Sequence, residues 1–537
     1  MMSNNNYRVQ SWEFGVRNQT LGWGILFACL ASRIAFMGNY LEGWDDVDFA
    51  LALHDYDISR YQPHFPGYPV YIFFCWLVSK ISSNDVLALT LPGSIFGALT
   101  ILPLYSLAKE MFSREAAFVT ALLFIVNPLC WLQSERPTSD SMGLFFLVLS
   151  VQLLFTSLRS QKYSITYFVV GGIVFALTLG IRLDYFPFIA IWVFALICIC
   201  RQKGKVAAIC CGIASLAFGM SLWLIPLIHH VKFTNLLGNA LTFTNGHFTD
   251  WGGTVGTLPH ISLRLLAFLQ CLLCNGLGFW WHDTSTINLI PSLIMIMGVL
   301  SYRKHLFQNL LANCHCEPKA KQSHYMGLLR SFNSLAMTRT CNWLSNERTK
   351  FILLYIIPYS LWALFCQNIE KPRHILPLVP MLLICLSYGL VKISPDNVFK
   401  TIIIGLLAVA LGVSSFSLVI KHKRTPPLQV QVMNYITDNF DKLSTRLYCW
   451  DTKRLFDYYA PVWDTRRARN ISGLKYDINS SLVIPDTVLC TSQVEGIARA
   501  ISGMTLLRRF RTDRYIDNPC SELSLYVINT NPKTELF

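Results

Sequence analysis

Long apolar runs recur along most of this chain, and they limit what it can fold into. Runs of this kind are near 20 residues, enough for a helix to cross a hydrocarbon core of about 30 Å. Charged residues make up only 14% of the 537 residues, against about 25% in soluble domains. The sequence predicts a polytopic α-helical membrane protein with about 11 transmembrane helices. The expected spans are 20–38, 85–108, 115–133, 140–158, 164–181, 184–200, 206–228, 286–302, 351–367, 374–392 and 400–420.

The basic residues between the runs predict an orientation. The connectors "KEMFSRE", "RSQK", "RQKGK" and "SYRKH" carry Lys and Arg, which favour the cytoplasmic side. All four fall on that side if the apolar pieces 68–82 and 263–281 do not cross the membrane but lie at the outer interface. The net charge of +14 is then explained by the excess of Lys and Arg in cytoplasmic loops. No basic patch interleaved with aromatic residues lies outside the predicted spans, so nucleic-acid binding is not expected.

The composition divides the chain into two domains. Residues 1–420 form the multi-span domain, which has an outer loop at 39–84 and a polar insert at 303–350. Lys and Arg outnumber Glu in the insert, which is therefore expected in the cytoplasm. Part of it, "CEPKAKQSHYMGLLRSFNSLAMT", resembles peptides translated from bacterial palindromic repeat DNA. Residues 421–537 predict a small C-terminal α/β domain on the outer side.

Cysteines predict no metal centre. Most of the 17 lie singly inside apolar runs, where a thiol behaves as a small apolar group. Cys314-His315-Cys316 is a polar cluster, but it lacks the paired spacing of zinc sites. Cys449, Cys490 and Cys520 leave room for one disulfide in the tail.

Polar residues from distant parts of the chain converge on the outer face. They come from 43–64, 134–140, 182–185, 229–253 and 369–374. Charged residues beside membrane spans are costly and usually functional. A solvated rim with helix caps is the simpler alternative, since Asp45 or Asp46 could cap a helix that reads "VDFALALHDY".

The first outer loop carries the most specific pattern in the sequence. "WDDVDFALAL" followed by "QPHFPGYPVYI" resembles the first outer loop of multi-span, type C glycosyltransferases that use lipid-linked sugars. Protein O-mannosyltransferases (glycosyltransferase family 39) and aminoarabinose transferases belong to this group. The resemblance extends in layout over about 20–420 and includes Asp140 in "SERPTSD" and the segment "KPRHILPLVP".

The resemblance implies roles for particular residues. Asp45 and Asp46 form the catalytic acid pair, with the first acid as general base. The second acid is more usually Glu in that family, so the division of labour between the two remains open. The leaving group in such a reaction is a phosphate, which cations should bind. The candidate donor-phosphate ligands on the outer side are Arg373, Lys371, Arg182, Arg60 and His64. The implied substrate-binding residues are Asp140, His374 and Tyr68. Arg182 could equally be a buried partner of Asp184.

The expected function is inverting transfer of a sugar from a polyprenyl-phosphate donor to an acceptor hydroxyl, at the periplasmic face of a bacterial inner membrane. The acceptor could be a lipid, a glycan or a protein. No cofactor is expected, although Asp46-Val47-Asp48 has the DxD spelling that can hold a divalent cation. The alternatives are a transporter or flippase for a lipid-linked sugar and an inactive assembly protein.

Overall fold

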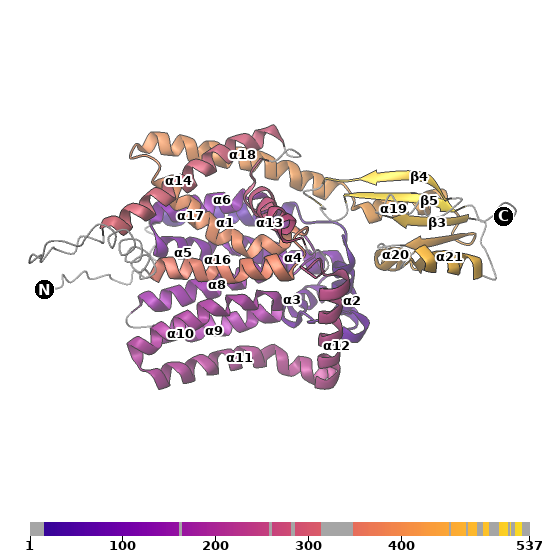
Figure 1. The fold of residues 1–537 in the computed structure, drawn as a ribbon, viewed down its shortest axis with the longest axis horizontal. Coiled ribbons are helices and arrows are strands. Elements are labelled where there is room, and N and C mark those ends of the chain that lie inside the picture. The colour runs from indigo at the N-terminus through magenta and orange to yellow at the C-terminus, as the bar shows by residue number, and fades with distance from the viewer. Residues whose placement is uncertain are drawn as a thin grey trace, which may run out of the picture.

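The structure, a computed structural model, describes most of the chain. The described residues are 16–160, 164–256, 260–280, 285–312, 347–449, 453–468, 471–480, 487–492, 504–513, 516 and 521–528. Long helices lie side by side in a bundle, and a small domain with a β-sheet lies at one end of it (Figure 1). Most of the polar insert and Cys314-His315-Cys316 lie outside the described residues.

Within the described ranges, nine helical segments are long and apolar enough to cross a membrane, and a bent pair makes up to ten. The polytopic helical fold is therefore confirmed, whereas the count of 11 stays a prediction. Helix α1 (Val16–Ala35) is apolar over a shorter stretch, from Trp23 to Ala35. The nine segments are Asp85–Met111, Asp140–Arg159, Ser164–Ile181, Leu183–Lys203, Lys205–Val231, Thr286–His305, Glu347–Cys366, Pro372–Val391 and Asn397–Asn439.

The expected span at 115–133 is bent rather than straight. It consists of α6 (Arg114–Ile125) and α7 (Pro128–Ser134), which meet at 57°. Proline lacks the amide hydrogen that would continue the ladder of α6, so Pro128 starts a new helix instead. Asn127 caps that helix, because its side chain accepts a hydrogen bond from the backbone of Cys130 at 2.9 Å.

Several short helices gather at the end of the bundle that carries the sheet domain (Figure 1). They include α2 (Trp44–His54), α3 (Pro69–Ser79) and α12 (Phe233–Gly246). Helix α12 runs across the direction of the long helices. The expected interfacial pieces correspond to α3 and to α13 with the following π-helix (Ile261–Leu277), which are apolar but short.

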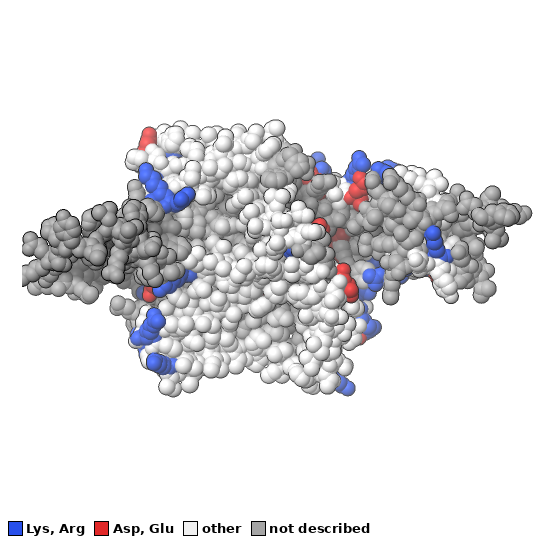
Figure 2. Space-filling model, viewed as in Figure 1, with Lys and Arg blue, Asp and Glu red and all other residues white. Residues whose placement is uncertain are grey.

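Charged side chains avoid the middle of the bundle. On the face drawn in Figure 2, mostly Lys and Arg with a few acidic side chains gather at one end, and charges of both signs gather at the end beside the sheet domain. The band between them shows almost no charge. This distribution is that of a protein whose middle lies in hydrocarbon.

The C-terminal domain begins with α19 (Leu428–Asn439) and contains a five-stranded sheet in the order β2-β1-β3-β5-β4. Strands β1 (Thr445–Cys449), β2 (Asp464–Arg467) and β3 (Thr487–Ser492) are parallel. Strands β4 (Met504–Arg511) and β5 (Glu522–Ile528) are antiparallel to each other, and β5 is antiparallel to β3. Cys449 and Cys490 are both free thiols, and Cys520 lies outside the described residues.

The C-terminal domain packs directly on the first outer loop. Helix α20 (Lys453–Tyr459) supplies Leu455 and Phe456 to a hydrophobic cluster that also contains Val47 and Phe49 of α2. Polar contacts join the same surfaces: Tyr458 donates to Asp85 at 2.6 Å, and the backbone N–H of Leu41 donates to the hydroxyl of Tyr459 at 2.8 Å. The loop and the domain therefore share one core.

Candidate active site

Asp46 fixes the turn that begins α2. Its carboxylate accepts hydrogen bonds from the backbone N–H groups of Glu42 and Gly43, at 2.9 and 3.1 Å. Such a cap satisfies amide groups that have no partner within the helix. Burial raises the pKa of Asp46 to about 8, and the negative charge of Glu42 adds to the rise. The helix-cap alternative is thus realised at Asp46, which leaves Asp45 free to make a different contact.

Asp45 binds Arg373, which lies 328 residues further along the chain. The Nη2 atom of Arg373 lies 2.5 Å from Oδ2 of Asp45, and both side chains are largely shielded from solvent. Burial alone would raise the pKa of Asp45, but the charges of Arg373, His64 and Lys371 outweigh it and hold that pKa well below its ordinary value. The charge of Asp45 in turn adds a smaller contribution to the raised pKa of Asp46, after burial and Glu42.

Arg182 is held between two carboxylates. Its Nη1 atom donates to Asp140 at 2.7 Å, while Nε and Nη2 donate to the two oxygens of Asp184 at 3.1 and 2.9 Å. The sequence left Arg182 open between an ion pair with Asp184 and phosphate binding. In the structure it binds Asp184 and fixes Asp140 as well. Asp140 is fully buried, so this contact stabilises a charge that would otherwise be costly there.

The proline-rich loop places His64 and Tyr68 beside α2. His64 contacts Asp48 through Nδ1 at 3.1 Å and the Tyr68 hydroxyl through Nε2 at 3.0 Å. Gly67 between them has φ +92°, and a Cβ there would lie 2.5 Å from the Tyr56 hydroxyl. The turn therefore requires glycine.

Tyr68 lies near the charged residues of both ion pairs. Burial raises the pKa of its hydroxyl above the ordinary value, and the charges of Arg182, Asp45, Asp184 and Arg373 also act on it. The two ion pairs and the His64 contact therefore lie around one region at the end of the bundle.

Four buried polar atoms in this region have no hydrogen-bond partner among the described residues. They are Nε of Arg373, Nδ1 of His374, Oδ2 of Asp140 and the hydroxyl of Tyr185. Buried polar groups are nearly always hydrogen-bonded in proteins, so a concentration of exceptions needs an explanation. A polar substrate with several oxygen atoms would supply these partners.

The structure places Arg60 and the Asp46/Asp48 pair in surroundings that differ from those suggested by the sequence. The guanidinium of Arg60 binds Asp57 at 2.7 Å and also Asp55 at the surface, so the structure does not bring it to the buried group. Asp46 and Asp48 share no ligand position, because Asp46 caps α2 while Asp48 binds His64. The described residues contain no group of three or more His, Cys, Asp or Glu side chains arranged to hold a metal ion.

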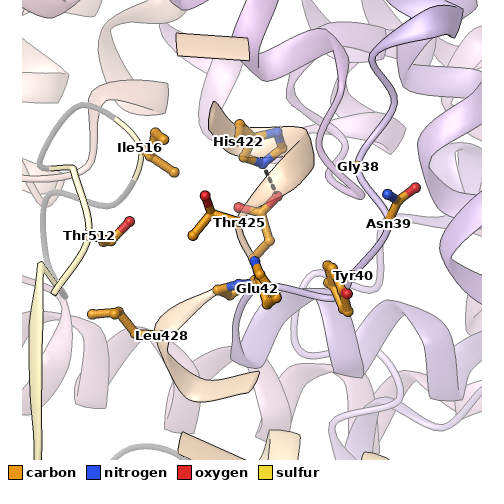
Figure 3. Close-up of a pocket in the computed structure, with 11 residues that line it drawn as sticks. Gly38, Asn39, Tyr40, Glu42, His422, Thr425, Leu428, Thr512 and Ile516 are labelled. Carbon is orange, nitrogen blue, oxygen red and sulfur yellow. Dashed lines mark hydrogen bonds and ion pairs between the residues drawn. The ribbon is translucent and has the colours of Figure 1, made fainter. Parts of the chain in front are cut away.

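A second charged cluster beside Asp46 was not predicted. Glu42 contacts Arg136 at 3.2 Å and His422 at 2.6 Å, and His422 lies 3.6 Å from Glu135. Glu42 and His422 line a small pocket, partly open to solvent, between the first outer loop and the C-terminal domain (Figure 3). Lone acids and a His at span ends resemble ordinary helix termini in sequence, and only folding brings them together.

Comparison with known proteins identifies the fold. Residues 63–226 match the model of the dolichyl-phosphate-mannose-protein mannosyltransferase family. The crystal structure of ArnT from Cupriavidus metallidurans bound to undecaprenyl phosphate is similar with a TM-score of 0.53. The two sequences are 12% identical, and the similarity covers 95% of this chain and 98% of ArnT. The chain has a type C glycosyltransferase fold.

The type C fold confirms the resemblance drawn from the first outer loop. The archaeal oligosaccharyltransferase of Archaeoglobus fulgidus is also similar, at 13% identity, with a TM-score of 0.45 over 89% of this chain and 70% of that chain. No curated protein sequence matches. The family match covers Asp140 and Arg182 but begins after α2 and ends before Arg373, so it includes neither Asp45 nor Arg373.

Proposed function

We propose that this protein is an inverting glycosyltransferase that moves a sugar from a polyprenyl-phosphate donor to a hydroxyl group of an acceptor. The observation that carries the proposal is the pairing of Asp45 with Arg373. The reaction needs a base for the hydroxyl and a cation for the leaving phosphate, and these side chains supply both. The matched family and the undecaprenyl phosphate bound to ArnT support this class of donor.

In the proposed step, the acceptor oxygen attacks the anomeric carbon from the side opposite the phosphate, and the configuration at that carbon inverts. The hydroxyl proton passes to a carboxylate oxygen of Asp45. The bond between the anomeric carbon and the phosphate oxygen breaks, and its electron pair remains on the polyprenyl phosphate. Arg373 and Lys371 stabilise the charge of the leaving phosphate.

Because Asp45 contacts Arg373, binding of the donor phosphate to Arg373 should change the basicity of Asp45. Without donor, the cations around Asp45 keep its pKa low, and the carboxylate is ionised but weakly basic. Arg373 has a buried Nε–H without a protein partner among the described residues. A phosphate that binds there shares the guanidinium charge with Asp45, so the pKa of Asp45 rises towards a useful range. The base thus becomes stronger when the donor is in place.

The neighbouring residues position the substrates. Asp46 holds the turn that presents Asp45, and Arg182 fixes the orientation of Asp140. Oδ2 of Asp140, His374 and Tyr68 then face the sugar hydroxyls as hydrogen-bond partners. The proposed step uses no cofactor.

We place the reaction at the periplasmic face of a bacterial inner membrane. The site lies at the end of the bundle that carries the C-terminal domain (Figure 1), and a polyprenyl phosphate in the outer leaflet reaches that depth. The transferred group is a hexose or a pentose, and the acceptor is a lipid, a glycan or a protein.

The test uses purified protein in lipid with labelled polyprenyl-phosphate sugars and measures single-turnover transfer or release of the sugar. Removing a general base typically costs about 10²–10⁴ in rate. The variant Asp45→Asn should lose that much while it still binds the donor. Asp55→Asn, an exposed acid at the end of the same helix, is the matched control and should react at the wild-type rate.

Three results would contradict the proposal. The first is an Asp45→Asn rate within about threefold of wild type, which lies well below the range for base removal. The second is movement of the labelled lipid across the bilayer without sugar transfer, as a flippase would produce. The third is donor binding without turnover for every donor and acceptor tested, as an inactive assembly protein would give.

A further inference from the structure

Arg454, the second residue of α20 in the C-terminal domain, reaches into the first outer loop. Its Nε donates to Oδ1 of Asp48 at 2.9 Å, and its Nη2 donates to the backbone carbonyl of Tyr61 at 2.8 Å. The guanidinium also lies 5.8 Å from the ring centre of Trp44. One side chain therefore ties the C-terminal domain to both α2 and the proline-rich loop.

Asp48 is a fully buried carboxylate in the middle of α2. Arg454 binds its Oδ1 atom, and Nδ1 of His64 binds its Oδ2 atom at 3.1 Å. An isolated charge in such a position would be costly, and both partners stabilise the ionised form of Asp48. Burial raises the pKa of Asp48 and the charge of Asp45 raises it further, whereas His64 and Arg454 lower it.

Contact with Asp48 fixes the orientation of the His64 ring. Nδ1 of His64 lies 3.1 Å from Oδ2 of Asp48, and this contact places Nε2 at 3.0 Å from the Tyr68 hydroxyl. The His64 ring is also packed, because it stacks on Phe243 with ring centres 5.7 Å apart. The charge of His64 lowers the pKa of Asp45, and the charge of Asp45 raises the pKa of the Tyr68 hydroxyl.

We propose that Arg454 is a positioning residue for the transferase site. Arg454 holds Asp48 in place, and Asp48 in turn orients His64 and Tyr68 near Asp45. The C-terminal domain thereby contributes to the geometry of the active site. This inference rests on the proposed function. It assigns the C-terminal domain a role in positioning active-site residues, whatever the acceptor is.

The test compares Arg454→Gln with wild type in the full-length protein reconstituted in lipid. Misplacing a catalytic group by a small distance can cost about 10²-fold in rate, and a loss of kcat of that order is expected, with a smaller change in KM. The acid limb of the pH profile should move to higher pH, because Asp48 then protonates more readily. Guanidinium ions at low concentration should restore part of the activity of Arg454→Ala, whereas ammonium ions should not.

Arg467 offers a matched control, because its guanidinium lies 5.2 Å from the ring centre of the same Trp44. It is exposed and belongs to the same domain. The variant Arg467→Gln should keep its kcat within about twofold of wild type, as surface substitutions usually do. Thermal unfolding of both variants shows whether the domain still folds.

A double-mutant cycle tests whether the effect passes through Tyr68. If Arg454 acts through Asp48 and His64, the double variant Arg454→Gln/Tyr68→Phe should be little worse than the more impaired single variant. Fully additive losses would overturn the inference, and so would a wild-type kcat and pH profile for Arg454→Gln. Asp45→Asn is measured in parallel: if it alone loses activity, only the inference fails, and if it keeps activity, the proposed function fails.

Discussion

Asp45 and Asp46 are neighbours in the chain but have opposite electrostatic surroundings. Asp45 faces the cation of Arg373, while Asp46 accepts only backbone N–H groups and lies near the charge of Glu42. At neutral pH the first acid is therefore ionised, and the second is mostly protonated. This difference supports the proposed division of roles, in which Asp45 is the base and Asp46 holds the turn that presents it.

Asp46 should make stability depend on pH. Its pKa is raised in the folded protein to about 8, so its contribution is fully present below the ordinary pKa of Asp and is lost as the pH rises towards 8. Asp46→Asn, which resembles the protonated acid, should unfold at nearly the wild-type temperature at about pH 4, close to the ordinary pKa of Asp. At pH 9 it should be a few degrees more stable than wild type. Thermal unfolding at both pH values checks this, and a constant difference would contradict it.

Arg373 should dominate binding of the donor phosphate. A hydrogen bond to a charged group contributes about 1.5–3 kcal/mol, so Arg373→Ala should weaken the affinity for polyprenyl phosphate by about tenfold to a hundredfold. Arg373→Lys keeps the charge but loses the planar fork, and its loss should be smaller. Binding in detergent micelles measures both. Arg60→Ala removes a surface Arg paired with Asp57 and should bind like wild type; equal affinities for all variants would exclude the role of Arg373.

The acid pair and Arg373 could be named from sequence because they lie in short motifs next to spans. Their pairing could not, since a contact across 328 residues depends on how helices pack. The cluster of Glu42, Arg136 and His422 was missed for the same reason. Arg60 was included because it is a cation in the correct loop, but neighbouring Asp residues bind it at the surface.

At the scale of helices, α9 (Ser164–Ile181) and α11 (Lys205–Val231) approach closely through small residues. A Cβ added at Gly219 of α11 would lie 2.6 Å from Cβ of Ala176 and 2.8 Å from the backbone oxygen of Ile173. Small residues allow this approach in membranes, where packing rather than exclusion of water holds helices together. The variant Gly219→Val should therefore force the two helices apart.

We expect Gly219→Val to lose about 1–3 kcal/mol of stability, the usual cost of overpacking. Thermal unfolding in detergent measures the change. Gly405→Val is the control, because a Cβ at Gly405 of α18 (Asn397–Arg424) meets no atom within 4 Å. Equal melting temperatures for the two variants would show that α9 and α11 adjust freely.

Strand β2 is an example of an element that hydropathy in the sequence does not predict. It reads "DTRR" and is exposed or half-buried along its length, so it carries no apolar signal. It is nevertheless a strand because β1, whose residues are all buried, pairs with it at the edge of the sheet. The long apolar helices were predictable because hydropathy alone defines them, whereas an edge strand forms through its neighbour.

At the scale of the whole molecule, the orientation in the membrane remains a prediction from the distribution of Lys and Arg. Single cysteines introduced at the exposed positions Ser59 and Lys475 should react with an impermeant thiol reagent added to outer-permeabilised cells. A cysteine at Arg201, an exposed position in a basic connector, should be protected until the inner membrane is broken. Protection at both Ser59 and Lys475 would reverse the topology.

The helix that carries Arg373 lies in the interior of the bundle. Of the apolar window in Pro372–Val391, 83% is buried by protein, against 28% in Lys205–Val231, Thr286–His305 and Asn397–Asn439. A bilayer that is thinner or thicker than the hydrophobic belt tilts or deforms helices that touch lipid. The outer helices absorb such mismatch, while neighbouring helices set the depth of Arg373. If Arg373 binds the donor phosphate and Asp45 is the base, as proposed, the distance between them therefore changes little with acyl-chain length.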